Sequence, residues 1–101
     1  MAILARQVQH IYADKWEELE AIDKENTAVE AKYGFPPKKR YWMMSGQDEM
    51  GTLFVEYQWE SLAAMEEAHA KLMVDPVRQE LNKRGNGILR DIHFELYMIL
   101  P

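Results

Sequence analysis

The order in which strand-type and helix-type patterns follow one another restricts the fold of this 101-residue chain more than any other feature. Strands are expected over residues 2–12, 38–45, 52–59 and 89–100, and two kinds of side chain alternate, as is typical of strands, over residues 52–59 and 89–100. Apolar residues at three- and four-residue steps, typical of helices, follow Asp14 and Ser61. The pattern predicts a strand, a helix, two strands, a second helix and a final strand.

Local signals predict where the two helices begin and end. Asp14 opens a capping-box pattern for the first helix, and Gly34, followed closely by two prolines, ends it. Ser61 is the expected cap of the second helix. We expect Asp75 and Pro76 to interrupt this helix and restart it, with Asp75 as the new cap.

Two strand–helix–strand units around a central hairpin are the pattern of the ferredoxin-like fold, β-α-β-β-α-β. We expect an α+β domain over residues 1–101, with a four-stranded antiparallel sheet and two helices on one face. Right-handed crossovers place both helices on the same side, so the other face is left open. This open face would still carry apolar side chains such as Phe54 and Tyr97. Exposed apolar patches usually mark association surfaces, so we predict a homodimer through the open sheet face.

Composition excludes several classes of function. The net charge of −5 argues against binding of nucleic acids or anionic membranes, because both need a basic surface. The absence of cysteine excludes thiolate metal sites, iron–sulfur clusters and cysteine nucleophiles. Neither a membrane-spanning apolar run nor a signal-peptide pattern is visible, so we expect a cytoplasmic protein.

The last strand carries the strongest candidates for chemistry. Its even-numbered residues form one apolar face, which we expect to belong to the core. The other face places His93 between two carboxylates, one of them Glu95, and Tyr97 follows. Flanking carboxylates favour the protonated imidazole, so His93 is a candidate general acid or base, with Glu95 and Glu56 as orienting groups. Structural ion pairs at the same positions are the alternative interpretation.

Residues that would bind a substrate come from several strands. Gln7 and Gln9 share one face of the first strand, and we expect both to face the same cavity as Tyr97. Trp42 and Phe54 would add an apolar lining suited to a flat ligand. We expect no cofactor and no metal ion, because the histidines show no motif spacing such as His-Glu-x-x-His.

Two further features have structural interpretations. If the glutamines face the cavity, His10 lies near the helix side or the strand end, as a packing residue. The basic run at residues 38–40 is expected to protect an exposed edge strand from pairing with other sheets.

Four segments of the chain resemble the dimeric α+β barrel superfamily, and its NIPSNAP-like branch in particular: residues 14–19, 33–36, 51–54 and 59–64. The superfamily includes cofactor-free antibiotic-biosynthesis monooxygenases, haem-degrading monooxygenases, small-ring isomerases and members without known activity. The resemblance implies a dimer that holds its substrate between the sheet and the helices or inside the barrel. The haem-degrading members carry their haem-binding histidine shortly after the helix break. Residues 76–81 contain none, so we do not expect haem.

Taken together, these features favour a small homodimeric protein that binds a small, partly aromatic molecule in a barrel cavity. The resemblance implies a cofactor-free monooxygenase or isomerase. In that interpretation His93 is the base, Glu56 and Glu95 orient it, and Tyr97 with Gln7 positions the substrate. A non-catalytic ligand-binding or stress-associated dimer of the same shape is the alternative.

Overall fold

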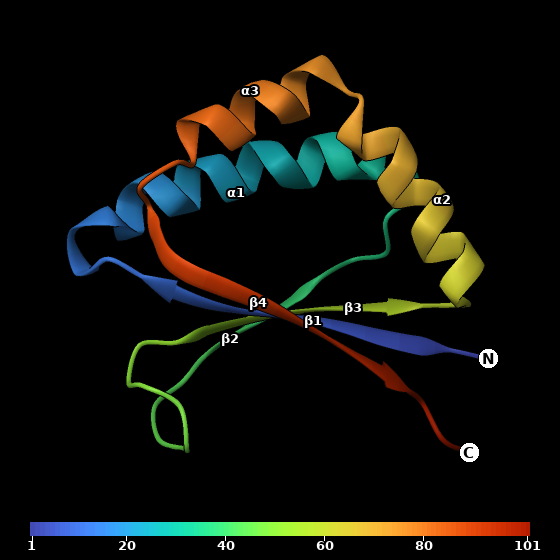
Figure 1. The fold of residues 1–101 in the computed structure, drawn as a ribbon, viewed down its shortest axis with the longest axis horizontal. Helices are drawn as coiled ribbons and strands as arrows, with labels where there is room; N and C mark the ends of the chain where they lie inside the picture. The colour runs from blue at the N-terminus through green and yellow to red at the C-terminus, as the bar shows by residue number, and fades with distance from the viewer.

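A four-stranded antiparallel sheet with helices on one side forms the framework of the protein (Figure 1), in a computed structural model that describes residues 1–101. The elements are β1 (Ile3–Ile11), α1 (Trp16–Ala31), β2 (Lys39–Trp42), β3 (Leu53–Trp59), α2 (Leu62–Met73), α3 (Pro76–Arg84) and β4 (Leu89–Met98). The strand order is β2-β3-β1-β4. The predicted α+β, ferredoxin-like fold is confirmed. No helix combines the length and apolar character that a membrane crossing needs.

The ends of the helices follow the sequence signals at three places and depart from them at one. Ser61 accepts a hydrogen bond from a backbone N–H in the first turn of α2, and Asp75 accepts two at the start of α3. Gly34 follows α1 with a φ of 77°, in the region that favours glycine. The prediction that Asp14 caps α1 is wrong. The chain leaves β1 through a 3-10 turn, η1 (Ala13–Lys15), so α1 begins only at Trp16 and has no side-chain cap.

The register of the strands assigns each side chain to a face of the sheet. Residues directly paired across neighbouring strands point to the same side. Gln7 of β1 pairs with Val55 of β3 and with Phe94 of β4. Val55 belongs to the buried core, so the odd-numbered residues of β1 and β3 and the even-numbered residues of β4 face the helices. For β3 and β4, this is the face predicted from the sequence.

The core fills the space between the sheet and the helices. One cluster of buried side chains consists of Ile3, Leu53, Val55, Tyr57, Trp59 and Ala68, and the other of Ile22, Val29, Leu72, Leu81 and Ile88. The ring of Phe35, just after the turn that ends α1, packs edge-on against Trp59 and His69, with 4.9 Å between centroids in both pairs. His69 is therefore a half-buried packing residue.

Strand β4 carries a row of apolar side chains that the helices leave uncovered. The sequence predicts these even-numbered residues to be core. They do lie on the helix side, but their exposure runs from 38% for Ile92 to 69% for Phe94. The reason is the position of β4 at the edge of the sheet. A ten-residue edge strand with an exposed apolar row is a surface suited to association.

Candidate functional site

The sheet separates the eight predicted site residues into two groups. His93, Glu56, Glu95, Tyr97 and Phe54 lie on the open face. Gln7, Gln9 and Trp42 lie on the helix side. The expectation that the glutamines share a cavity with Tyr97 is therefore wrong. Alternation within β1 separates two sets of residues, but only the pairing of Gln7 with Val55 shows which set faces the core.

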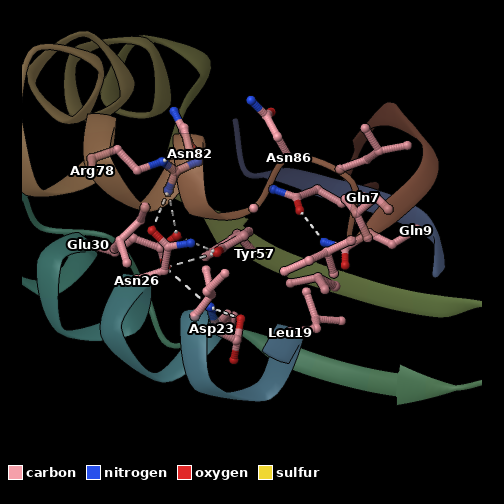
Figure 2. A pocket seen from close by; sticks show the side chains of 18 residues that line it. Gln7, Gln9, Leu19, Asp23, Asn26, Glu30, Tyr57, Arg78, Asn82 and Asn86 are labelled. Atoms are coloured by element: carbon pink, nitrogen blue, oxygen red, sulfur yellow. Dashed lines mark hydrogen bonds and ion pairs between the residues drawn. The ribbon is translucent and has the colours of Figure 1, made fainter. Parts of the chain in front are cut away.

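A cavity of about 230 Å³ lies on the helix side, between the sheet and helices α1 and α3 (Figure 2). The strands contribute Gln7, Gln9, Val55 and Tyr57, α1 contributes Asp23, Asn26 and Glu30, and α3 contributes Arg78 and Asn82. Apolar side chains that include Ile22, Leu81 and Ile92 complete the wall. Side chains from three strands and two helices thus line this cavity.

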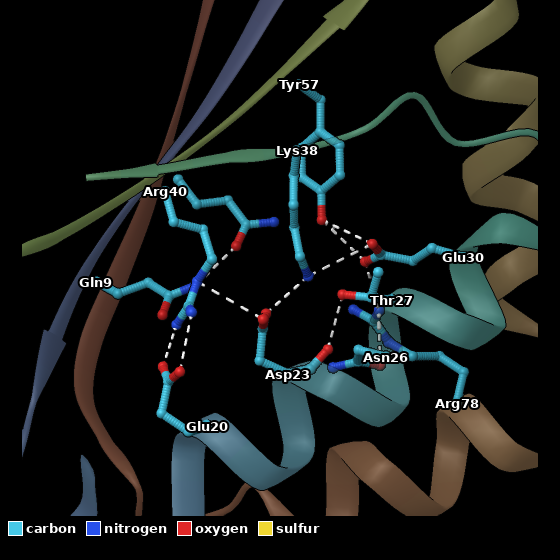
Figure 3. A network of polar contacts seen from close by, with 11 residues as sticks. Gln9, Glu20, Asp23, Asn26, Thr27, Glu30, Lys38, Arg40, Tyr57 and Arg78 are labelled. Carbon is cyan, nitrogen blue, oxygen red and sulfur yellow. Dashed lines mark hydrogen bonds and ion pairs between the residues drawn. The ribbon is translucent and has the colours of Figure 1, made fainter. Parts of the chain in front are cut away.

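A network of paired charges forms one side of this cavity (Figure 3). Both oxygens of the Glu30 carboxylate accept from the hydroxyl of Tyr57 at 2.9 Å. Lys38 Nζ lies 3.6 Å and Arg78 Nη1 3.5 Å from the same carboxylate, and Lys38 donates to Asp23 at 2.7 Å. Burial, assisted by the Glu30 charge, raises the pKa of Tyr57. Tyr57 is therefore a neutral phenol that donates its proton to the network.

The basic run before and within β2 supplies cations to this network. β2 is an edge strand, as expected, but protection of the edge is not the main role of the run. The Lys38 side chain is only 8% exposed, and Arg40 donates to Glu20 and lies 3.6 Å from Asp23. Of the three basic residues, only Lys39 is exposed. The sequence does hold a signal for this arrangement, since the acidic residues of α1 that meet these cations recur on one helical face.

A second polar cluster occupies the open face and is centred on Arg6. The guanidinium of Arg6 lies over two rings, 5.4 Å from the centroid of Phe54 and 5.5 Å from that of Tyr97. Arg6 Nη2 also lies 2.7 Å from Glu56, and the Tyr97 hydroxyl donates to Glu95 at 2.7 Å. The hydrogen bond from Arg6 to Glu56 raises the pKa of Arg6. The hydrogen bond from Tyr97 to Glu95 raises the pKa of Tyr97. The ion pair proposed as the structural alternative for Glu56 is thus the arrangement observed.

The histidine that lies between two carboxylates is His10, not His93. His10 bonds through Nδ1 to Asp91 and through Nε2 to Asp48, the latter at 3.0 Å. These bonds raise the pKa of His10, and the bond from His10 lowers that of Asp91. His93 is half exposed and lies 3.5 Å from Glu95. Asp91 pairs across the sheet with His10, and directly paired residues lie closer than residues two apart on one strand.

The stabilising effect of His10 is expected to depend on pH. Because its pKa is raised on folding, its contribution is fully present below about pH 6.5 and is lost as the pH rises through the raised value. The contribution of Asp91, whose pKa is lowered, is lost only as the pH falls well into the acid range. The free energy of unfolding, measured with denaturant, should therefore differ more between the wild type and His10→Asn at about pH 5.5 than at about pH 9. An equal effect of His10→Asn at both pH values would contradict the prediction.

No group of three or more histidine, aspartate or glutamate side chains is arranged to hold a metal ion. The two polar clusters differ in the donors and acceptors that they present. On the helix side these are amides, a phenol and paired charges around a cavity. On the open face they are carboxylates, a phenol, histidines and one arginine.

Solved structures with the same arrangement of strands and helices include several NIPSNAP proteins. The chain is similar to a NIPSNAP family protein from Agrobacterium tumefaciens, with a TM-score of 0.81 and 18% identity over 97% of this chain and 92% of that one. It is similar to an uncharacterized NIPSNAP domain protein from Burkholderia xenovorans, with a TM-score of 0.82 and 15% identity over 97% and 94% of the two chains. SnoaB, a cofactor-independent oxygenase from Streptomyces nogalater, matches with a TM-score of 0.69 and 13% identity over 97% and 92%.

No family model matches the chain, and no curated protein matches its sequence significantly. At identities below 20%, the likeness to the solved structures concerns the fold. At that level the chain has the ferredoxin-like fold of the NIPSNAP and antibiotic-biosynthesis-monooxygenase proteins, as its resemblance to them predicts.

Proposed function

We propose that this protein is a homodimer that binds a small, partly aromatic molecule in the cavity between its sheet and its helices. The observation that carries the proposal is the cavity itself, a partly open space of about 230 Å³. Its wall is partly apolar, and polar side chains from two strands and two helices converge on it (Figure 2). This combination of an apolar wall with a few converging polar groups is typical of small-molecule sites.

Two exposed surfaces support the dimer. The open face carries the rings of Tyr41 and Tyr97, which are 48% and 43% exposed. On the other side of the sheet, Phe94 and Leu96 of β4 are 69% and 56% exposed. Both surfaces meet at β4, whose outer edge has no neighbouring strand. A second copy on the open face would bury the first surface, and one that also reaches around the edge of β4 would bury the second.

Closing the mouth of the cavity is expected to weaken binding. Asn82 lies on α3, is exposed and lines the cavity, so Asn82→Trp would place a large ring at the mouth without disturbing the core. In a ligand-observed NMR screen of uncharged aromatic fragments, binding to Asn82→Trp should weaken by about tenfold or more. Lys83→Trp, at the next and equally exposed position outside the cavity, should bind as the wild type does. Fragments that bind Asn82→Trp unchanged would place the site elsewhere.

A cofactor-free monooxygenase or isomerase is the second candidate function. The fold likeness to SnoaB, a cofactor-independent oxygenase, favours it. On this proposal His93 is the base, and Glu95, 3.5 Å away, orients it on the open face of the sheet. His93→Ala should then abolish conversion of an aromatic compound bound against the open face, followed by mass spectrometry under air, and leave the dimer intact. Unchanged conversion in this variant would remove His93 from the reaction.

A further inference from the structure

Two glutamines on the sheet side of the cavity are joined by one hydrogen bond (Figure 2). Gln9 Nε2 donates to Gln7 Oε1 at 2.9 Å. Gln9 is only 9% exposed, and its Oε1 has no hydrogen-bond partner in the protein. A buried amide oxygen without a partner is costly, and native proteins leave few of them. Gln9 lines the cavity, but its Oε1 is itself shielded from solvent, so a ligand donor reaches this unpaired acceptor only when the Gln9 amide turns toward the cavity.

The charges that line the cavity are already paired with one another. The two acidic lining residues are Asp23 and Glu30, and the two basic ones are Lys38 and Arg78. Lys38 bonds to Asp23 at 2.7 Å, and Glu30 has Lys38, Arg78 and the phenol of Tyr57 within 3.6 Å. The lining thus has no net charge. A charged ligand would have to break these buried pairs to find a counter-charge, and breaking them costs free energy that no unpaired charge in the lining offsets.

The remaining lining is apolar and the volume is modest. Leu19, Ile22, Val55 and Ile88 form the apolar part of the wall. The cavity of about 230 Å³ is smaller than the sites that hold drug-sized ligands. The shape and chemistry therefore suit a compact molecule with an apolar body.

We propose that the site selects an uncharged, compact molecule that directs one N–H or O–H donor at Gln9 Oε1. The inference rests on the proposed function and adds the class of ligand. The hydrogen-bonded pair offers one acceptor at Gln9 and one amide nitrogen at Gln7, so a molecule with a donor and an acceptor, such as a lactam or a carboxamide, matches both. In this arrangement Gln9 is the residue that determines specificity, because it distinguishes a donor from a C–H group at the same place.

Three probes of similar size test the proposal by NMR titration of the full chain. Oxindole carries a lactam N–H, 2-indanone replaces this N–H by CH2, and indane-2-carboxylate adds a negative charge. We expect the wild type to bind oxindole about tenfold more tightly than 2-indanone, which is the effect of one neutral hydrogen bond. Indane-2-carboxylate should bind most weakly.

Variants locate the discrimination at Gln9. In Gln9→Met the preference for oxindole over 2-indanone should fall to about one, because the sulfur replaces the amide acceptor. Gln58→Met makes the same change at an exposed position of β3 outside the cavity, and should keep the wild-type preference. The amide spectrum of Gln9→Met shows whether this variant folds. If it does not, the preference of the wild type for oxindole over 2-indanone tests the proposal by itself.

The outcomes separate this inference from the function on which it rests. If none of the three probes perturbs the resonances of cavity residues, the proposed small-molecule site is wrong, and the inference falls with it. If 2-indanone binds as tightly as oxindole, or if Gln9→Met keeps the preference, the cavity binds ligands but Gln9 does not select a donor. Tightest binding of indane-2-carboxylate would overturn the assignment of an uncharged ligand.

Discussion

Replacing Glu30 by alanine is expected to lower the free energy of unfolding by about 3–5 kcal/mol, the cost of removing one partner from a buried ion pair. The carboxylate of Glu30 is 9% exposed and is the common partner of Tyr57, Lys38 and Arg78. Without it, the Lys38 side chain, itself 8% exposed, keeps only Asp23 as a counter-charge, and the phenol of Tyr57 keeps no acceptor. Denaturant unfolding monitored by circular dichroism measures the loss.

Two comparisons show whether burial of the network causes this loss. Glu25 lies on the same helix and pairs with Arg84 at 2.8 Å, but both side chains are about half exposed. Glu25→Ala should therefore cost about 0–1 kcal/mol. The double variant Glu30→Ala/Tyr57→Phe should be more stable than the sum of the single changes predicts, because the phenol is no longer left without an acceptor. A loss in Glu30→Ala no larger than in Glu25→Ala would contradict the role given to the network.

The sequence predicts the fold well because the fold depends largely on local signals. Ser61, Asp75 with Pro76, and Gly34 each set a helix end through bonds or backbone angles within a few residues. Alternation in β3 and β4 separates two sets of side chains correctly. The prediction fails at Asp14, where a 3-10 turn between β1 and α1 takes the place of a capped helix start.

The arrangement of the sites could not be predicted in the same way, because it depends on partners distant in the sequence. Within one strand, Gln7 and Gln9 can belong to either face, and only the pairing of β1 with β3 decides between them. The flanking of His93 by carboxylates is visible in the sequence, yet Asp91 bonds to His10, 81 residues away. The sheet order explains the exposed row of β4 in the same way, since an apolar strand at an edge has the same pattern as one in the middle.

The two polar systems of this protein lie on opposite sides of the same strands. Arg6 of β1 faces the open side and pairs with Glu56, and the neighbouring Gln7 faces the cavity between the sheet and the helices. A change on one side can therefore reach the other through a single peptide unit of β1. A second copy that covers the open face would restrict the backbone that carries Gln7 and Gln9. The assembly proposed here thus bears directly on the cavity.

Introducing charge into the exposed row of β4 is expected to convert a dimer into a monomer. At micromolar concentration the wild type should sediment with twice the 11.9 kDa mass of the chain. In Phe94→Glu/Leu96→Glu, two apolar side chains that are 69% and 56% exposed become anions in a chain that already has a net charge of −5. Loss of two apolar contacts at the edge of β4 is expected to cost about 3 kcal/mol or more, which weakens dimerisation at least about a hundredfold.

The control for this double variant is an apolar residue of equal exposure away from the sheet. Met73, at the end of α2, is 71% exposed, so Met73→Glu changes the same property of the surface without touching β4. It should leave the sedimentation of the protein unchanged. Tyr97→Glu, on the open face through which the dimer is proposed, should weaken the dimer as well. A wild type that sediments at 11.9 kDa contradicts the dimer altogether. A dimer that persists in Phe94→Glu/Leu96→Glu but dissociates in Tyr97→Glu would confine the contact to the open face, because the row on the helix side would then contribute nothing to it.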